Sequence, residues 1–131
     1  MHNVKQATEL QVSTPNEPGI LGRVLSTLAN AGVNLQALNA RSEKDRGVFF
    51  LLTSDNTKAK KCLEALGYQV ESRPVITVLI DDRIGAGAEI GALLGNAIVD
   101  VRHCYGSSAG PGKALLVVQT SDNRKAYDTL R

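Results

Sequence analysis

Tryptophan is absent from this chain of 131 residues, and aromatic side chains of all kinds make up only 4% of it. An excess of one charge is also lacking, because 15 lysines and arginines stand against 13 aspartates and glutamates. The densest basic group is Lys58, Lys60 and Lys61, and it is interleaved with apolar residues. Proteins that bind nucleic acid usually combine a basic stripe with stacking aromatic rings. We therefore expect no nucleic-acid partner.

Cysteine and long apolar runs are scarce as well. The two cysteines, Cys62 and Cys104, form no CxxC pair, so a disulfide framework is not expected. No apolar run approaches the length of a membrane span, and the first residues lack the apolar stretch of a signal peptide. We expect a cytoplasmic protein with no membrane partner. Hydrophobic residues at 43% and charged residues at 21% fit a globular fold.

The chain repeats itself. The string Thr53-Ser54-Asp55-Asn56 returns as Thr120-Ser121-Asp122-Asn123, and each copy follows an apolar run and leads into a helical pattern. Farther upstream, Pro18-Gly19 aligns with Ile84-Gly85 at a nearly constant offset. We interpret the series as a tandem duplication, with repeats at residues 1–73 and 74–131.

Periodicity predicts the order β-α-β-β-α-β within one copy. In the first copy the expected strands are residues 8–13, 33–41, 48–53 and 68–72, with helices after the first and third. The fold class is then α+β, with two ferredoxin-like βαββαβ repeats and helices on one face of antiparallel sheets. The second copy ends at Arg131 inside its second helix. It is predicted to lack its last strand, which leaves an incomplete sheet edge or a strand from another protomer.

Two predicted strands, residues 48–52 and 75–80, are apolar on both faces. Helices cover only one face of a sheet in this plan, so the second face needs another cover. We expect that cover to be a second sheet, from the other repeat or from the partner in a homodimer.

The turn and the step that follows it carry a family resemblance. Asn16-Glu17-Pro18-Gly19-Ile20-Leu21, an amphipathic helix and then Ala31-Gly32-Val33-Asn34-Leu35 resemble the ACT domain. That family has a D/N-x-P-G-x-L turn after its first strand and a G-V/I-N-I/L step at its second. The second copy is similar at Asp82-Arg83-Ile84-Gly85-Ala86 and Ile98-Val99-Asp100-Val101, with Ile84, Gly87 and Asp100 departing from the pattern. The resemblance implies a non-catalytic, allosteric regulatory module that binds amino acids between paired domains.

The residues of the turn suit a ligand on physical grounds. Pro18 fixes φ, Gly19 permits unusual conformations, and the amides of Gly19, Ile20 and Leu21 are expected to lack partners at the start of a helix. A helix N-terminus attracts a carboxylate, and the Asn34 side chain can address either end of a zwitterion. The predicted ligand-binding residues are Asn16, Pro18, Gly19, Ile20, Leu21 and Asn34 in the first repeat, and Asp82, Gly85, Ala86, Gly87 and Asp100 in the second.

The second turn is more open, because Gly85, Ala86 and Gly87 provide no apolar anchor. Asp100 would repel a carboxylate but can hold an ammonium group. Either this site has lost function, or one composite site uses a different end of the ligand in each repeat. We expect Asn34→Ala to weaken binding more than Asp100→Ala does.

Other site classes are weaker. Gly85, Gly87 and Gly91 mimic a dinucleotide fingerprint, but they do not follow the strand directly and the distant acidic residue is missing. His103 and Cys104 suit a soft metal, yet neighbours on a strand point to opposite faces. No nucleophile has an adjacent base, so we expect no catalytic residue, metal site or cofactor.

The sequence thus predicts a sensor of a free amino acid that regulates amino-acid metabolism, with a separate amino-acid-pathway enzyme as its regulated partner. Two alternatives stay open: a ligand-free protein-assembly module and a metal-sensing regulatory domain.

Overall fold

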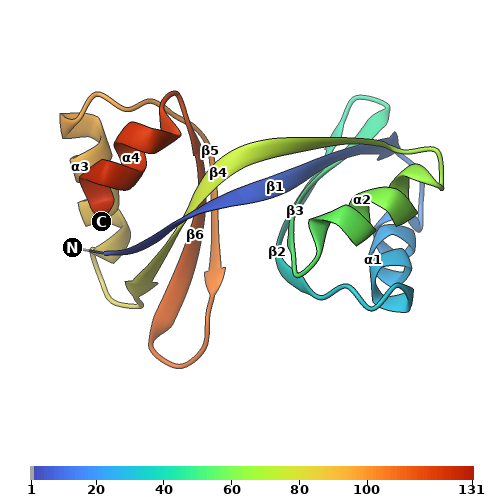
Figure 1. The fold of residues 1–131 in the computed structure, drawn as a ribbon, viewed down its shortest axis with the longest axis horizontal. Helices are drawn as coiled ribbons and strands as arrows, with labels where there is room; N and C mark the ends of the chain where they lie inside the picture. Colours follow the sequence, from blue (N-terminus) through green and yellow to red (C-terminus); the bar gives the residue numbers. More distant parts are fainter. Residues whose placement is uncertain (1) are drawn as a thin grey trace. The chain divides into compact units, whose positions relative to one another are not determined.

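The computed structural model describes residues 2–131, and Figure 1 shows the arrangement of its helices and strands. They are β1 (Asn3–Pro15), α1 (Ile20–Asn30), β2 (Leu35–Glu43), β3 (Arg46–Thr53), α2 (Asn56–Glu64), β4 (Gln69–Asp81), α3 (Ala86–Asn96), β5 (Val101–Ser108), β6 (Lys113–Thr120) and α4 (Asn123–Leu130). The strands form an antiparallel sheet in the order β2-β3-β1-β4-β6-β5, and the fold is α+β.

The chain divides into two compact units. The first unit is Thr8–Arg73, and the second unit is residues 2–7 together with Pro74–Arg131. The long strands β1 and β4 each give one half to either unit. The sequence analysis assigned all of residues 1–73 to the first repeat, whereas the structure places residues 2–7 in the second unit.

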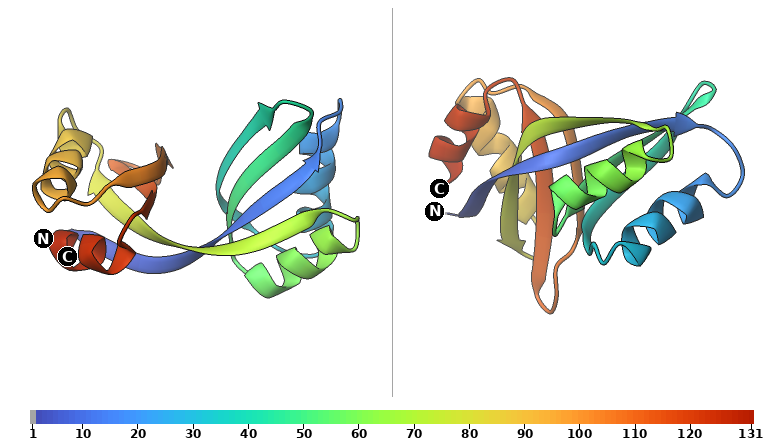
Figure 2. Two further views of the ribbon diagram at one scale, coloured as in Figure 1. Left: turned by 90° about the horizontal axis from the view of Figure 1, so that it is seen from above. Right: turned by 45° about the vertical axis from the view of Figure 1, so that its right-hand side comes forward.

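The first unit has the strand order β2-β3-β1-β4, with α1 and α2 side by side on one face (Figures 1 and 2). Its helices form where apolar residues recur at helical spacing, and the stripes Val24/Leu28 and Ala59/Leu63 are buried. These side chains pack on the helix-facing residues of the strands, which are Leu10, Val12, Phe49, Leu51 and Val70. Alternation along a strand puts one face of each strand into this core.

The second unit has the same plan, and the beginning of the chain completes it. Its strand order is β1-β4-β6-β5, with α3 and α4 in contact. Val4, in the half of β1 that belongs to this unit, is buried in the core with Ile76 and Leu130. The His2 amide donates a 3.0 Å hydrogen bond to the Leu130 carbonyl. The sheet of the second unit therefore has no incomplete edge at this place, and it needs no strand from another protomer. Residues 3–7 of the same chain occupy the place of the strand that was predicted to be missing.

The helix ends show how closely the two units correspond. Asp55 and Asp122 cap α2 and α4, each accepting a 3.0 Å hydrogen bond from the amide three residues later. At the ends of α1 and α3, the Val33 and Val99 amides donate back to Leu28 and Leu94, each at 2.9 Å. These bonds define Schellman motifs, in which one residue takes a left-handed conformation. That residue is glycine in the first unit (Gly32, φ 74°) but isoleucine in the second (Ile98, φ 57°).

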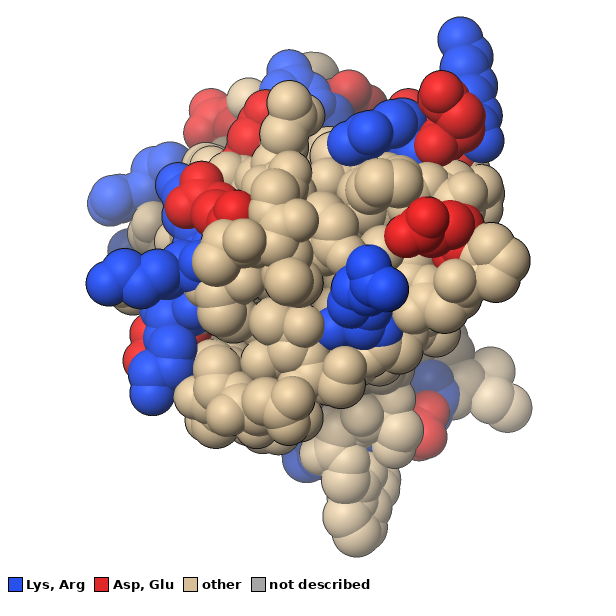
Figure 3. Space-filling view, turned by 90° about the vertical axis from the view of Figure 1, so that its right-hand side faces the viewer, with Lys and Arg blue, Asp and Glu red and all other residues tan. Residues whose placement is uncertain are grey.

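Within residues 2–131, no helix has the length and apolar character needed to cross a bilayer. The face drawn in Figure 3 mixes basic, acidic and uncharged side chains. No cluster of three or more His, Cys, Asp or Glu side chains that could hold a metal ion occurs among these residues.

Candidate functional site

The first turn joins β1 to α1 around a left-handed glycine. Gly19 ends the turn with φ 91°. A residue with a side chain would adopt this left-handed conformation only with strain. The Ile20 amide donates to the Glu17 carbonyl at 3.2 Å, so the expectation that this amide is free is wrong. The tight turn brings that carbonyl within reach. The amides of Leu21 and Gly22 have no partner among the described residues, and they remain available to an anion.

A cavity of about 310 Å³ opens beside this turn. It is lined by Asn16, Ile20, Leu21, Ala40, Arg41, Ser42, Gly47 and Phe49. Strand register explains why residues from the turn and from β2 and β3 line one cavity, because Gly47 pairs with both Thr14 of β1 and Ser42 of β2. The turn and the β2–β3 hairpin therefore lie at the same end of the first unit.

The polar groups of this cavity come from the turn and the hairpin. The Ser42 hydroxyl donates to Asn16 Oδ1 at 3.2 Å, and the Asn16 amide donates to the Asp45 carbonyl at 3.1 Å. The Arg41 guanidinium lies 5.1 Å from the Phe50 ring centre and pairs with Glu43. Phe50 is on the strand face opposite Phe49, so the guanidinium points away from the cavity. The lining thus offers a hydroxyl, a carboxamide and apolar walls, with no carboxylate.

The second turn has the same backbone but different chemistry. Gly85 has φ 88°, the Asp82 amide donates to Gly112, and the Ala86 amide donates to Arg83. Ile84, which stands where the first turn has Pro18, is fully exposed at 101%. Among residues 2–131 the amides of Gly87 and Ala88 have no partner, as at the first turn. The backbone alone therefore does not distinguish the two turns.

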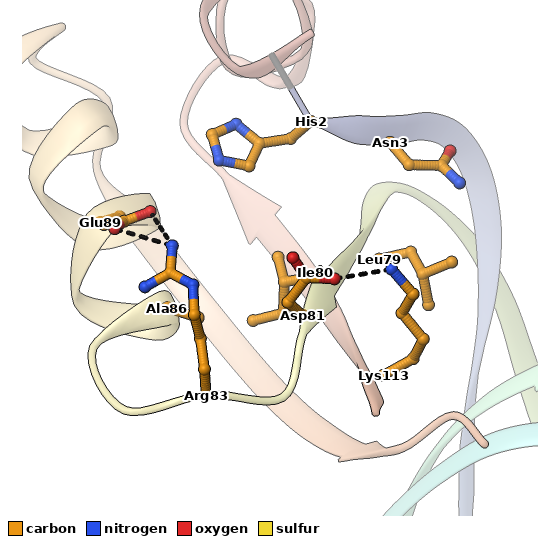
Figure 4. A pocket seen from close by; sticks show the side chains of 9 residues that line it. All are labelled: His2, Asn3, Leu79, Ile80, Asp81, Arg83, Ala86, Glu89 and Lys113. Atoms are coloured by element: carbon orange, nitrogen blue, oxygen red, sulfur yellow. Dashed lines mark hydrogen bonds and ion pairs between the residues drawn. The ribbon is translucent and has the colours of Figure 1, made fainter. Parts of the chain in front are cut away.

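A cavity of about 330 Å³ beside the second turn is strongly polar (Figure 4). Arg83 Nη2 donates to both carboxylate oxygens of Glu89 at 2.8 Å, and Lys113 Nζ donates to Asp81 Oδ1 at 2.6 Å. The Lys113 hydrogen bond and charge hold the pKa of Asp81 below its usual range. The Glu89 hydrogen bond and charge raise the pKa of Arg83. His2, Asn3, Leu79, Ile80 and Ala86 complete the lining.

The ion pairs at the two turns have opposite polarity. In the first unit Arg23 lies on α1 and is 3.9 Å from Glu17 in the turn. In the second unit the acid, Glu89, is on the helix and the base, Arg83, is in the turn. A helix N-terminus carries partial positive charge, which Glu89 offsets and Arg23 reinforces. Each turn thus holds one acid and one base, and the two units differ in which of them stands on the helix.

Asn34 and Asp100 do not meet the turns within their own units. Asn34 follows α1, and that helix of 11 residues separates it from Gly19 by about 16 Å along the axis. The Asn34 backbone exchanges two 2.9 Å hydrogen bonds with Ser54, and Asp100 makes the same pair of contacts with Ser121. Both side chains are exposed and carry no hydrogen bond within the described residues. The structure thus brings together Asn16, Ile20 and Leu21 but not Asn34.

Several lining residues were missed by the sequence analysis. Ser42 and Ala40 could be found from hairpin register, and Lys113 is set opposite Asp81 by the pairing of β4 with β6. Nothing in the sequence indicated that His2 and Asn3 line the second cavity, because their position in the chain assigns them to the first repeat. Pro18 and Gly19 form the backbone of the first turn without lining its cavity, and the same is true of Asp82, Gly85 and Gly87 at the second.

Comparison with known proteins agrees with this architecture. Residues 8–68 match the ACT domain, so an ACT domain is present in the first unit. The chain is similar to protein BT0572 from Bacteroides thetaiotaomicron, at 27% identity and TM-score 0.89, over 97% of this chain and 88% of that one. It also shares its fold with the regulatory subunit of aspartate kinase from Thermus thermophilus, at 14% identity and TM-score 0.70, over 97% and 93% of the two chains. No curated protein sequence matches the chain.

Proposed function

We propose that the protein is a pair of tandem ACT-type repeats that senses a free amino acid and regulates amino-acid metabolism without catalysing a reaction. The observation that carries this proposal is the cavity at the first turn. It combines the Leu21 amide, which has no partner among residues 2–131, with the Asn16 carboxamide and the Ser42 hydroxyl. Its lining has no carboxylate to compete with that of a ligand.

Each part of an amino acid has a matching group there. A carboxylate is attracted to the amides at the start of α1. The Asn16 and Ser42 oxygens can accept from an ammonium group. Ile20, Leu21 and Phe49 offer apolar walls for a small side chain. A volume of about 310 Å³ is at the lower end of the range for small-molecule sites.

The tandem duplication is supported by the agreement of the two units. β1 and β4 have the same burial pattern along all 13 residues, and the caps and Schellman motifs recur. We further propose that the protein acts as a homodimer, in which Asn34 of one copy approaches the first turn of the other. In this arrangement the Asn34 carboxamide reaches a first turn, which it cannot do within its own unit because α1 separates the two. A regulated amino-acid-pathway enzyme is the partner that a non-catalytic sensor requires.

A thermal-shift screen against the twenty amino acids tests the proposal. A ligand at a hundred times its dissociation constant adds about 2.7 kcal/mol, which raises the melting temperature by several degrees. We expect one amino acid, or a few related ones, to stabilise the protein. Ser42→Ala should reduce the shift, whereas Ser108→Ala, the matching hydroxyl in the second unit, should leave it unchanged.

The Asn34 side chain provides a test of the composite site. We expect Asn34→Ala to weaken ligand binding more than Asp100→Ala does, measured by isothermal titration calorimetry. Equal losses of affinity in the two variants would show that Asn34 is not part of the site. A ligand-bound protein that sediments as a monomer would refute the homodimer. No stabilisation by any amino acid would favour the ligand-free assembly module.

A further inference from the structure

A cavity of about 770 Å³ lies along α2 in the first unit, and neither strand-to-helix turn contributes to it. Its lining consists of Thr8 of β1, Ser72 of β4, and residues of α2 and its C-cap at positions 56, 57, 60, 61, 64 and 65. These positions follow helical spacing, so one face of α2 forms a wall of the cavity. All of the lining belongs to the first unit, and Figures 1 and 2 show α2 beside the halves of β1 and β4 in that unit.

The strands contribute hydroxyl groups to this cavity. Thr8 is on the same face of β1 as Leu10, and Ser72 is on the same face of β4 as Val70, because side chains alternate along a strand. Leu10 and Val70 are buried beneath the helices, whereas Thr8 and Ser72 are exposed. The Asn56 carboxamide donates to the Thr8 carbonyl at 2.9 Å, which fixes the start of α2 beside β1. The helix-facing side of the sheet therefore presents hydroxyls next to the first residues of α2.

Two ammonium groups of the lining have no acidic partner among residues 2–131. Lys60 is half-buried and Lys61 is exposed, and neither side chain makes an ion pair or a hydrogen bond within that range. The hydroxyls of Thr8, Thr57 and Ser72 make no hydrogen bond there either. The one carboxylate of the lining, Glu64, is about one helical turn beyond the lysines, at the end of α2 away from Thr57. Five side chains thus offer uncommitted donors around one cavity.

The second unit builds the matching helix face differently. When α4 is aligned with α2 through their capping aspartates, Lys61 corresponds to Asp128. Asp128 pairs with Arg124 at 3.1 Å and with Arg131 at 3.5 Å. That face of α4 therefore neutralises its own charges. The fold does not require unpaired lysines at this place, and they are particular to the first unit.

We propose that this cavity binds a small molecule through a phosphate group. Phosphate has three acceptor oxygens and up to two negative charges, which match two ammonium groups and three hydroxyls better than the two oxygens and single charge of a carboxylate. Lysine binds phosphate as a point charge. Glu64 repels an anion from its own end of the cavity, so the phosphate lies between the two lysines and the strand hydroxyls. A volume of about 770 Å³ also has room for the organic part of a phosphate ester. This site does not depend on the amino-acid site at the first turn.

Nuclear magnetic resonance titrations of the whole chain at constant ionic strength test the proposal. The probes are inorganic phosphate and glycerol phosphate, with acetate as a carboxylate of similar size. We expect both phosphates at millimolar concentrations to shift the amide resonances of residues 8, 57, 60, 61 and 72 in a saturable way. Acetate should produce no saturable shift at these residues. Tighter binding of glycerol phosphate would assign the site to phosphate esters, and tighter binding of inorganic phosphate would assign it to the free ion.

Two matched double variants separate the cavity from general surface charge. Lys60→Gln with Lys61→Gln should weaken phosphate binding roughly tenfold. Lys58→Gln with Lys125→Gln removes the same charge from exposed residues that do not line the cavity, and it should leave binding unchanged. Glu64→Gln removes the one carboxylate of the lining and should strengthen binding.

Three results would overturn the proposal. They are the absence of a saturable shift with either phosphate, equal shifts with acetate, and equal weakening in the two double variants, which would show that net charge alone attracts the anion. Phosphate-induced shifts confined to residues 16, 21 and 42 would also refute this site, because they would place the anion at the first turn. None of these results bears on whether an amino acid binds at that turn.

Discussion

Replacing Ile98 by glycine should make the protein more stable, although it removes a large apolar side chain. Ile98 is the left-handed residue that ends α3, with φ 57°, and 87% of its surface is exposed. The side chain therefore contributes almost nothing to the core. Its β-branch makes the left-handed conformation particularly unfavourable.

The magnitude follows from two opposing terms. The left-handed conformation costs an L-residue roughly 1–2 kcal/mol, with β-branched residues at the upper end. Glycine gives back about 0.5–1 kcal/mol through the larger freedom of the unfolded chain. We expect Ile98→Gly to stabilise by about 1 kcal/mol, which raises the melting temperature by about 4 °C.

The first unit supplies the mirror experiment. Gly32 holds the equivalent place with φ 74°, and a Cβ there would meet no atom within 4 Å. Gly32→Ile should therefore destabilise through backbone conformation alone, by a similar amount. Both variants can be measured by chemical denaturation at one protein concentration. If Ile98→Gly is neutral or destabilising while Gly32→Ile behaves as expected, the Ile98 side chain is buried in an assembly, and the reasoning from exposure fails.

Three further predictions follow from the two units. Val4→Ala should lower the free energy of unfolding by about 2 kcal/mol, because Val4 belongs to the core of the second unit. Hydrogen-exchange protection should then be lost in α4 but not in α2. Val70, which is buried at the equivalent place of the first unit, should give the reverse result when replaced by alanine. The Asp81 carboxyl should titrate below its usual pKa in NMR, because Lys113 favours the charged form. Since the folded-state pKa is lowered, this pair stabilises above the unfolded pKa of about 3.9 and loses that effect as pH falls through the folded value. Lys113→Gln should return the Asp81 pKa toward its usual value, and an unchanged pKa would contradict the assignment. Asp55→Ala and Asp122→Ala should each cost about 1 kcal/mol in thermal unfolding, and a loss confined to one of them would show that the two caps are not equivalent.

The element order could be predicted from the sequence because local signals agreed with it. Apolar spacing marked α1 through Val24 and Leu28, and turn residues bounded it at Gly19 and Gly32. The start of β1 was missed, because the predicted strand begins at residue 8 and the observed one at Asn3. Val4 is the only residue of that extension buried in a core, and one buried side chain gives no periodic signal.

The site was only partly predictable, for a geometric reason. The turn at Gly19 is local, so its conformation follows from the residues themselves. Ser42 reaches the same cavity through strand register, which depends on the pairing of β2 with β3. His2 reaches the second cavity only because the chain start completes the second unit, and periodicity contains no information about that. Asn34 shows the opposite case, since the family resemblance grouped it with a turn from which the whole of α1 separates it within one unit, and its place in a site stays a prediction.

The two units together act as an internal comparison of what the fold requires. Where they agree, as in the caps and the serines that hold Asn34 and Asp100 in place, the residue is explained by structure. Where they differ at the same backbone position, structure alone cannot be the reason, because the other unit does without it. The reversed ion pairs at the two turns are such a difference, because the acid is in the turn in the first unit and on the helix in the second.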